Sequence, residues 1–168
     1  MARFHRFLLL LIAVTLPAIG WGGSGTLGCT SSAGGGGMTI LHHDNGEVTE
    51  IRIDAKQEAC AVAQLQALIA TAGQPVRLIV TDQIVEAATG EGEWMEFLFT
   101  QAREFRKGDG SGLTMGRLLV PIRHPTYARP DGGGNLIFFP AKDGWLTGPL
   151  ASSEGQSLIP DLVACLQG

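Results

Sequence analysis

The sequence predicts an α+β fold: an antiparallel sheet of about five to six strands, with one long helix packed on one face and a short C-terminal helix. Three observations lead to this class. The dipeptide Asn45-Gly46 joins two alternating segments, residues 54–72 carry a helical period, and residues 94–105 and 113–123 form two strand patterns around a glycine-rich loop. Strands joined by hairpins, with few helices, favour an antiparallel sheet that is covered on one face.

The first element is predicted to be a hairpin of strands 38–43 and 47–53. Asn-Gly is the strongest short-range hairpin signal, because both turn positions need a positive φ. Paired residues share a face of the sheet, so the two-residue loop places four apolar side chains on one side. The predicted pairs are Asp44 with Glu47, His42 with Thr49, Ile40 with Ile51, and Met38 with Ile53.

A helix follows, which Asp54 caps with Gln57 as its capping-box partner. Apolar residues at spacings of three and four predict one core-facing stripe along it: Val62, Leu65, Leu68, Ile69 and Ala72. Gly73 and Pro75 then end the helix.

The rest of the chain reads mainly as strands. Residues 76–81, 94–105, 113–123, 136–139 and 145–150 are predicted strands, and a helical turn is expected around 84–88. A short helix is predicted to begin near Ser157, with Pro160 tolerated in its first turn.

Residues 1–20 have the pattern of a signal peptide: a basic start, an apolar run over residues 7–14, and a small-x-small site at Ala18-Ile19-Gly20. The apolar run is shorter than the ~20 residues that a membrane span needs. We therefore predict a signal peptide over 1–20, a flexible Gly/Ser-rich tether over 21–37 and one globular domain over 38–168.

The cysteines leave two processing routes open. Thr26-Leu27-Gly28-Cys29 resembles a bacterial lipobox, although Thr26 and the polar residues before it depart from the pattern, so Cys29 is a candidate for lipid attachment. Cleavage after Gly20 is the other route. Cys60 and Cys165 are candidates for a disulfide, which an oxidising compartment favours, and their alternative is two small buried side chains.

Charge excludes some classes of partner. Of the 12 Lys and Arg residues, Arg3 and Arg6 lie in the signal segment, so 10 remain against 16 acids, a net charge of −6. An acidic domain without a basic stripe is a poor match for nucleic acid or for an anionic membrane surface.

No residue set forms a catalytic or cofactor motif. His42, His43 and Asp44 resemble metal ligands, but neighbours in a strand point to opposite faces and cannot easily share an ion. We therefore predict no metal, no cofactor and no catalytic residue. Acids in the segment 91–96 are interpreted as solvated. The alternative that stays open is a small hydrolase, in which His124 works with a carboxylate such as Asp131 or Glu96.

The leading hypothesis is an exported, non-catalytic binding or accessory protein of the bacterial cell envelope, periplasmic or extracellular. A structural envelope lipoprotein, tethered through Cys29, is the third reading. A binding protein needs an exposed patch, which we predict at Trp94, Arg103, Arg117 and Trp145. The expected partner is another envelope or extracellular protein, and any membrane contact is expected only through a lipid anchor. The sequence does not indicate the oligomeric state.

Overall fold

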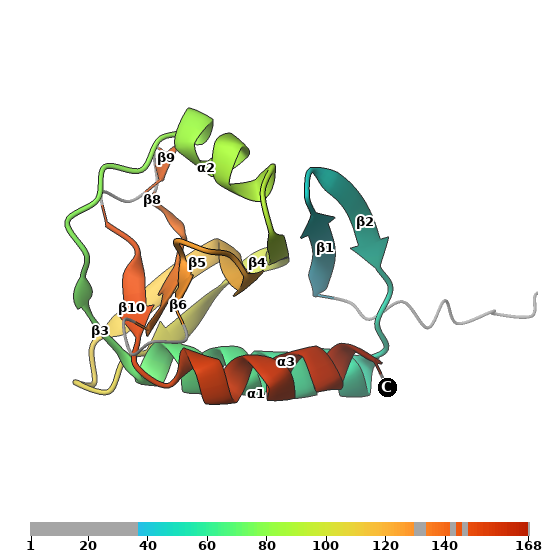
Figure 1. The fold of residues 1–168 in the computed structure, drawn as a ribbon. Helices are drawn as coiled ribbons and strands as arrows, with labels where there is room; N and C mark the ends of the chain where they lie inside the picture. The colour runs from blue at the N-terminus through green and yellow to red at the C-terminus, as the bar shows by residue number, and fades with distance from the viewer. Residues whose placement is uncertain (1–36, 130–133, 142–143, 146–147, 168) are drawn as a thin grey trace, which may run out of the picture. The chain divides into compact units, whose positions relative to one another are not determined.

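The computed structural model describes residues 37–129, 134–141, 144–145 and 148–167 (Figure 1). The predicted signal segment, nearly all of the tether, and Cys29 lie outside these residues. The described strands form two antiparallel four-stranded sheets and one two-stranded ribbon, together with three helices. The α+β class is confirmed, whereas the prediction of a single sheet is wrong.

The first sheet contains the predicted hairpin. Its strand order is β2-β1-β4-β5, and its strands are β1 (Met38–Asp44), β2 (Glu47–Ile51), β4 (Glu93–Arg106) and β5 (Gly112–Arg123). Asn45 and Gly46 have φ angles of 49° and 88°, which confirms the predicted turn. The pairs Ile40–Ile51, His42–Thr49 and Asp44–Glu47 confirm the register, but β2 ends at Ile51, and Met38 pairs with Phe99 of β4.

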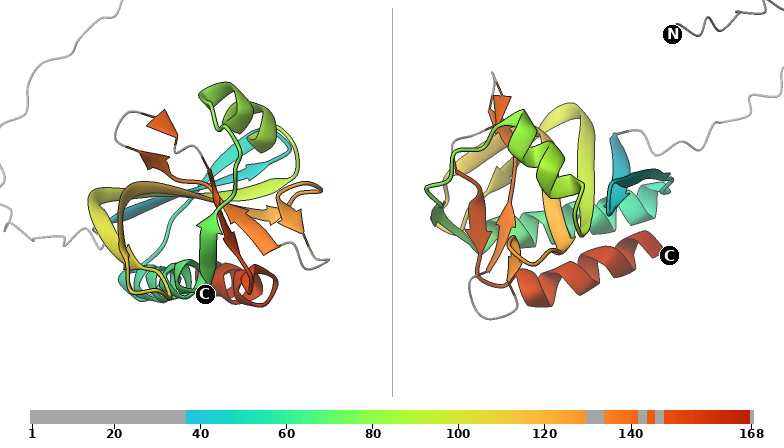
Figure 2. Two further views of the ribbon diagram at one scale, coloured as in Figure 1. Left: turned by 90° about the vertical axis from the view of Figure 1, so that its left-hand side faces the viewer. Right: turned by 45° about the horizontal axis from the view of Figure 1, so that its top comes forward.

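Two helices lie side by side and cover one face of this sheet: α1 (Ala55–Ala70) and α3 (Gly155–Gln167) (Figures 1 and 2). The Asp54 carboxylate accepts hydrogen bonds from the Lys56 and Gln57 amides, and the Gln57 side chain accepts one from the Asp54 amide, so the capping box is confirmed. The predicted C-terminal helix is present as α3, which has 13 residues and lies beside α1.

Helix α3 starts two residues before the predicted position near Ser157, at a glycine that lies close to the second sheet. The helix begins at Gly155, where a side-chain Cβ would lie 2.7 Å from the Cβ of Asn135. Only glycine lets the backbone approach the second sheet so closely. The earlier start places Pro160 in the interior of the helix, on its exposed side, and not in the first turn.

The second sheet consists of short strands in the order β3-β10-β7-β6. They are β3 (Ala72–Pro75), β6 (Ala128–Arg129), β7 (Gly134–Ile137) and β10 (Leu150–Ser152), and the ribbon is β8 (Pro140–Ala141) with β9 (Gly144–Trp145). The predicted strand 76–81 is wrong, because the chain pairs earlier, at β3, and then leaves the sheet. Ile79 is 72% exposed, so the β-branched run did not mark a buried strand.

Helix α2 (Asp82–Thr89) lies on the opposite side of the β4–β5 hairpin from α1 and α3 (Figure 1). Side chains of β4 alternate between the two sides. Met95, Phe97 and Phe99 enter the main core against α1 and α3, whereas Trp94 enters a smaller core with residues of α2. This alternation decides which polar groups of β4 face α2. No helix in the described ranges is long and apolar enough to cross a membrane.

Candidate functional site

Trp94 does not belong to an exposed binding patch. Its side chain has no exposed surface, and its indole Nε1 donates to the carbonyl oxygens of Ala88 and Glu91, at 2.9 Å and 3.0 Å. The aromatic ring packs against Phe138 and Tyr127. Trp94 therefore fixes the end of α2 to the sheet, and its predicted role at the surface is wrong.

Arg103 and Arg117 do not form one recognition face. The Arg103 guanidinium lies 2.6 Å from the Glu58 carboxylate on α1 and 5.6 Å from the centre of the Phe99 ring. Arg117 instead pairs with Glu96, beside α2. The two arginines lie on opposite sides of an irregularity in the β4–β5 pairing, between Leu98 and Arg103.

Trp145 lies on the ribbon strand β9, where it pairs with Pro140, and its side chain falls outside what the structure describes.

Cys60 and Cys165 form a disulfide, with their Cα atoms 5.6 Å apart. The bond joins α1 to α3 across 105 residues of sequence, so it fastens together the two helices that cover the main core.

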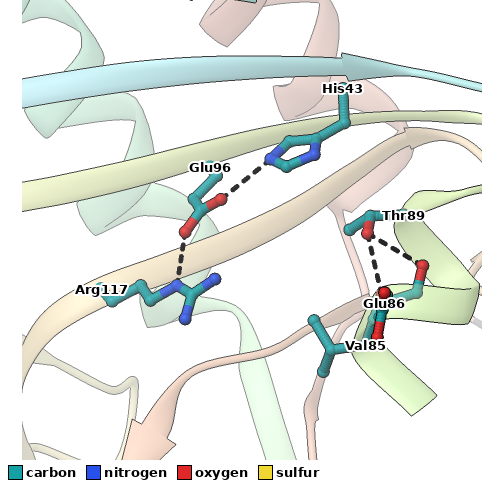
Figure 3. Close-up of polar contacts among 6 residues, drawn as sticks. All are labelled: His43, Val85, Glu86, Thr89, Glu96 and Arg117. Carbon is teal, nitrogen blue, oxygen red and sulfur yellow. Dashed lines mark hydrogen bonds and ion pairs between the residues drawn. The ribbon is translucent and has the colours of Figure 1, made fainter. Parts of the chain in front are cut away.

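The most developed polar cluster consists of His43, Glu96 and Arg117, on three adjacent strands (Figure 3). Glu96 lies at the centre and is only 4% exposed. One of its carboxylate oxygens lies 2.9 Å from His43 Nε2, and the other accepts from Arg117 Nε. A buried carboxylate requires such partners, because an unpaired charge in the protein interior is very costly.

A similar cluster lies on the other face of the sheet. His42 Nε2 is 2.9 Å from Glu93 Oε1, and Arg123 Nε donates to the second oxygen of that carboxylate. The adjacent histidines thus point to opposite faces, as expected for neighbours in a strand, and each bonds a different glutamate of β4. Across the described ranges, no group of three or more His, Cys, Asp and Glu residues is placed to hold a metal ion.

The His43–Glu96–Arg117 cluster lines a pocket of about 350 Å³ between the sheet and α2. Helix α2 contributes the rest of the lining: Asp82, Val85, Glu86 and Thr89. The Thr89 hydroxyl donates to the carbonyl oxygens of Val85 and Glu86, at 3.0 Å and 3.2 Å (Figure 3). Three carboxylates and one guanidinium therefore line this pocket, and two of the carboxylates, on Asp82 and Glu86, belong to exposed residues.

His124 is buried away from this pocket and hydrogen-bonds no carboxylate within the described residues. Its Nδ1 accepts from the amides of Thr126 and Tyr127, at 3.0 Å and 3.2 Å, and burial lowers the pKa of its imidazole below the usual 6.5. Glu96, one acid proposed for a hydrolase, is bonded to His43 and Arg117 instead. Asp131, the other, lies outside the described residues.

The sequence analysis named Glu96 only as a possible partner of His124 and otherwise interpreted the acids of this segment as solvated, so the cluster of Glu96 with His43 and Arg117 was missed. A signal was present, since Glu96 stands between Met95 and Phe97 in an otherwise apolar stretch of strand. Such a residue is either at an edge or buried with a partner. Comparison of the chain with protein-family models, curated proteins and solved structures gives no match.

Proposed function

We propose that this chain is an exported, non-catalytic binding or accessory protein of the bacterial cell envelope, which holds a cationic group of its partner in the pocket between α2 and the first sheet. The observation that carries this proposal is the charge of the pocket lining. Asp82, Glu86 and Glu96 supply three carboxylates, against the one guanidinium of Arg117. An excess of negative charge in a partly enclosed site favours a lysine or arginine side chain.

The three acids of the pocket differ in burial, and this difference supports the binding of a cation: Glu96 is buried in the pocket wall, whereas Asp82 and Glu86 are exposed at its edge. Glu96 is buried and has a partner for each carboxylate oxygen, so it sets the shape of the wall. Asp82 and Glu86 are exposed on α2 and can reach an incoming cation. Exposed acids beside a low-dielectric wall attract a cation without the cost of desolvating a buried charge.

The bonding in the pocket argues against nucleophilic catalysis there. The Thr89 hydroxyl donates to the backbone of its own helix, and His43 Nε2 is bonded to Glu96 rather than to a hydroxyl. An activated nucleophile requires a hydroxyl or thiol within hydrogen-bond reach of a base. The residues lining this pocket include no such pair.

Export is supported by the signal-like residues 1–20 and by the Cys60–Cys165 disulfide, since such bonds persist mainly in oxidising compartments. Attachment through Cys29 is tested separately. If the lipobox reading is right, the Cys29→Ser variant moves from the membrane fraction to the soluble fraction. A variant that stays in the membrane fraction rules out the lipid tether.

The proposed function is tested with a blocked tetralysine peptide as a simple cationic probe, titrated calorimetrically at low salt. The Asp82→Asn/Glu86→Gln variant should bind it about 5- to 30-fold more weakly, since each exposed ion pair contributes roughly 0.5–1 kcal/mol. Added salt should weaken binding to the wild-type protein.

The matched control is Glu154→Gln/Asp161→Asn, which removes the same charge at exposed positions beside and on α3, across the sheet from α2. It should bind the peptide like the wild type. Equal weakening in the two variants would show attraction by net charge alone and would contradict a site at α2. Absence of binding at low salt would contradict it as well.

A further inference from the structure

His124 occupies an unusual position for a histidine. It follows the end of β5 and is 7% exposed. Its Nδ1 accepts hydrogen bonds from the backbone amides of Thr126 and Tyr127. This is the role that an Asn or Asp oxygen plays when it closes a turn two or three residues ahead. An imidazole can play it only when Nδ1 carries no proton.

The other ring nitrogen is buried, and none of the described residues bonds it. Because Nδ1 is an acceptor, the neutral ring carries its proton on Nε2, which has no hydrogen-bond partner in the described part of the chain. Two aromatic rings pack against the imidazole, whose ring centre lies 5.2 Å from that of Trp94 and 4.6 Å from that of Tyr127. The site tolerates a neutral imidazole and provides little that would stabilise a charged one.

This turn is connected to helix α2. Residues 90–92 join α2 to β4, and Gly92 lies against the imidazole: a Cβ there would be 3.3 Å from His124 Cδ2 and 2.3 Å from the Arg123 carbonyl oxygen. The Trp94 indole, in contact with the same imidazole, bonds the carbonyl oxygens of Ala88 and Glu91. The C-terminal end of α2 therefore depends on the position of Trp94 and His124.

We propose that His124 is a pH-operated latch, which holds the turn 124–127, Trp94 and the C-terminal end of α2 together while it is neutral and releases them when it takes up a second proton. The incoming proton adds to Nδ1. Nδ1 then carries a hydrogen that points at the two amides, so it can no longer accept their hydrogen bonds. The proton also places a positive charge beside the aromatic rings. This proposal is independent of the proposed function, because it stands on the turn and not on the pocket.

In the described part of the chain, the charged and titratable residues around His124 are Glu91, Tyr127 and Arg123. Burial lowers the pKa of His124 below 6.5, and it outweighs Glu91, from the segment 90–92, which favours the protonated form. Tyr127 contributes its ring from the turn. Arg123, the preceding residue, bonds Glu93 through its side chain. Release is therefore expected at a mildly acidic pH, below that of an exposed histidine.

The test is an NMR titration of the full exported chain with labelled histidine, from about pH 7.5 down to about 4.5. Single His42→Gln and His43→Gln variants assign the other two histidine signals. The neutral His124 should show the Nε2–H tautomer. As it titrates, the amides of Thr126 and Tyr127 and the Trp94 indole N–H should lose protection from exchange on the order of tenfold or more, while amides of α1 keep theirs.

His124→Asn is the matched variant, because its side-chain oxygen can accept the same two amides but cannot titrate. Its protection at these three groups should not change with pH over this range. The latch is overturned if a folded His124→Asn protein shows the same transition. Should that variant fail to fold, the wild-type titration still decides: the latch is also overturned if His124 takes up its proton while the three groups stay protected, or if α1 loses protection at the same pH.

Discussion

Removing the disulfide should change the stability of this protein more than most single substitutions. The Cys60–Cys165 bond joins α1 to α3 and closes a loop with a sequence separation of 105 residues. Cys60 is exposed and Cys165 is half-buried. Replacing both with alanine therefore leaves little cavity in the folded state, and the main effect should fall on the unfolded chain, which gains freedom when the loop opens.

The chain-entropy relation gives about 4.7 kcal/mol for a loop of about this length. A domain of ordinary size has roughly 5–15 kcal/mol of stability in total, so the loss would be a large share of it. In urea, with a slope of roughly 1–3 kcal/mol/M, the unfolding midpoint of Cys60→Ala/Cys165→Ala should fall by about 2–5 M. The slope itself should rise, because the unlinked chain exposes more surface on unfolding.

The control is the wild-type protein in the presence of a reductant, which should unfold like the double variant. A stabilising role for the disulfide is contradicted if the double variant and the oxidised wild type unfold at the same urea concentration. A fall in midpoint without an increase in slope would instead assign the effect to lost contacts in the folded state, and not to the freedom of the unfolded chain.

Three further predictions concern the connection between the sheet and α2. Gly92→Ala should lower the free energy of unfolding, measured in urea, by at least about 2 kcal/mol, because a Cβ at φ +74° would lie 2.3 Å from the Arg123 carbonyl oxygen. Gly110→Ala is the control: its φ is +82° but the space around it is open, so it should lower the free energy of unfolding by only about 1 kcal/mol. Glu96→Gln should cost about 1–3 kcal/mol by removing the buried carboxylate charge that faces Arg117 and His43. In a double-mutant cycle, Glu96→Gln and Arg117→Met together should cost less than the sum of the two single substitutions. His124 binds a proton more readily in the unfolded chain than in the folded one, because its pKa is lowered in the folded state. The free energy of unfolding should therefore decrease as the pH falls from 6.5 towards that lowered pKa. A folded His124→Asn protein should lack this pH dependence.

Local signals predicted local structure well. Asn45-Gly46 specified its turn and register because both requirements lie within a few residues: a positive φ twice, and alternating side chains on either side. The capping box at Asp54 and Gln57 is similarly local. The long strands β4 and β5 were found because residues typical of strands extend over 14 and 12 positions on the two sides of a glycine-rich loop.

The second sheet could not be predicted in the same way. Its strands have two to four residues each, too few for a periodic pattern to stand out. Leu150 pairs with both Pro75 and Ile137, so these short strands are stabilised by neighbours that are distant in sequence. The run 76–81 had the composition of a strand, but among the described residues its backbone pairing stops at Val76, whose amide donates to the Pro149 carbonyl oxygen, and the chain then turns towards α2.

The candidate site depends on register more than on any motif. Glu96 has partners because β1 brings His43 beside it and β5 brings Arg117, and a shift of one residue in either strand would turn those side chains to the opposite face. Trp94 and Glu96 are two apart on β4, so both face α2: Trp94 holds the C-terminal end of that helix, and Glu96 forms the wall of the pocket. One helix thus connects the proposed latch to the proposed binding site. Loosening at His124 should therefore alter how Asp82 and Glu86 are presented, and binding of the cationic peptide by wild-type protein should weaken more steeply on acidification than binding by a folded His124→Asn protein.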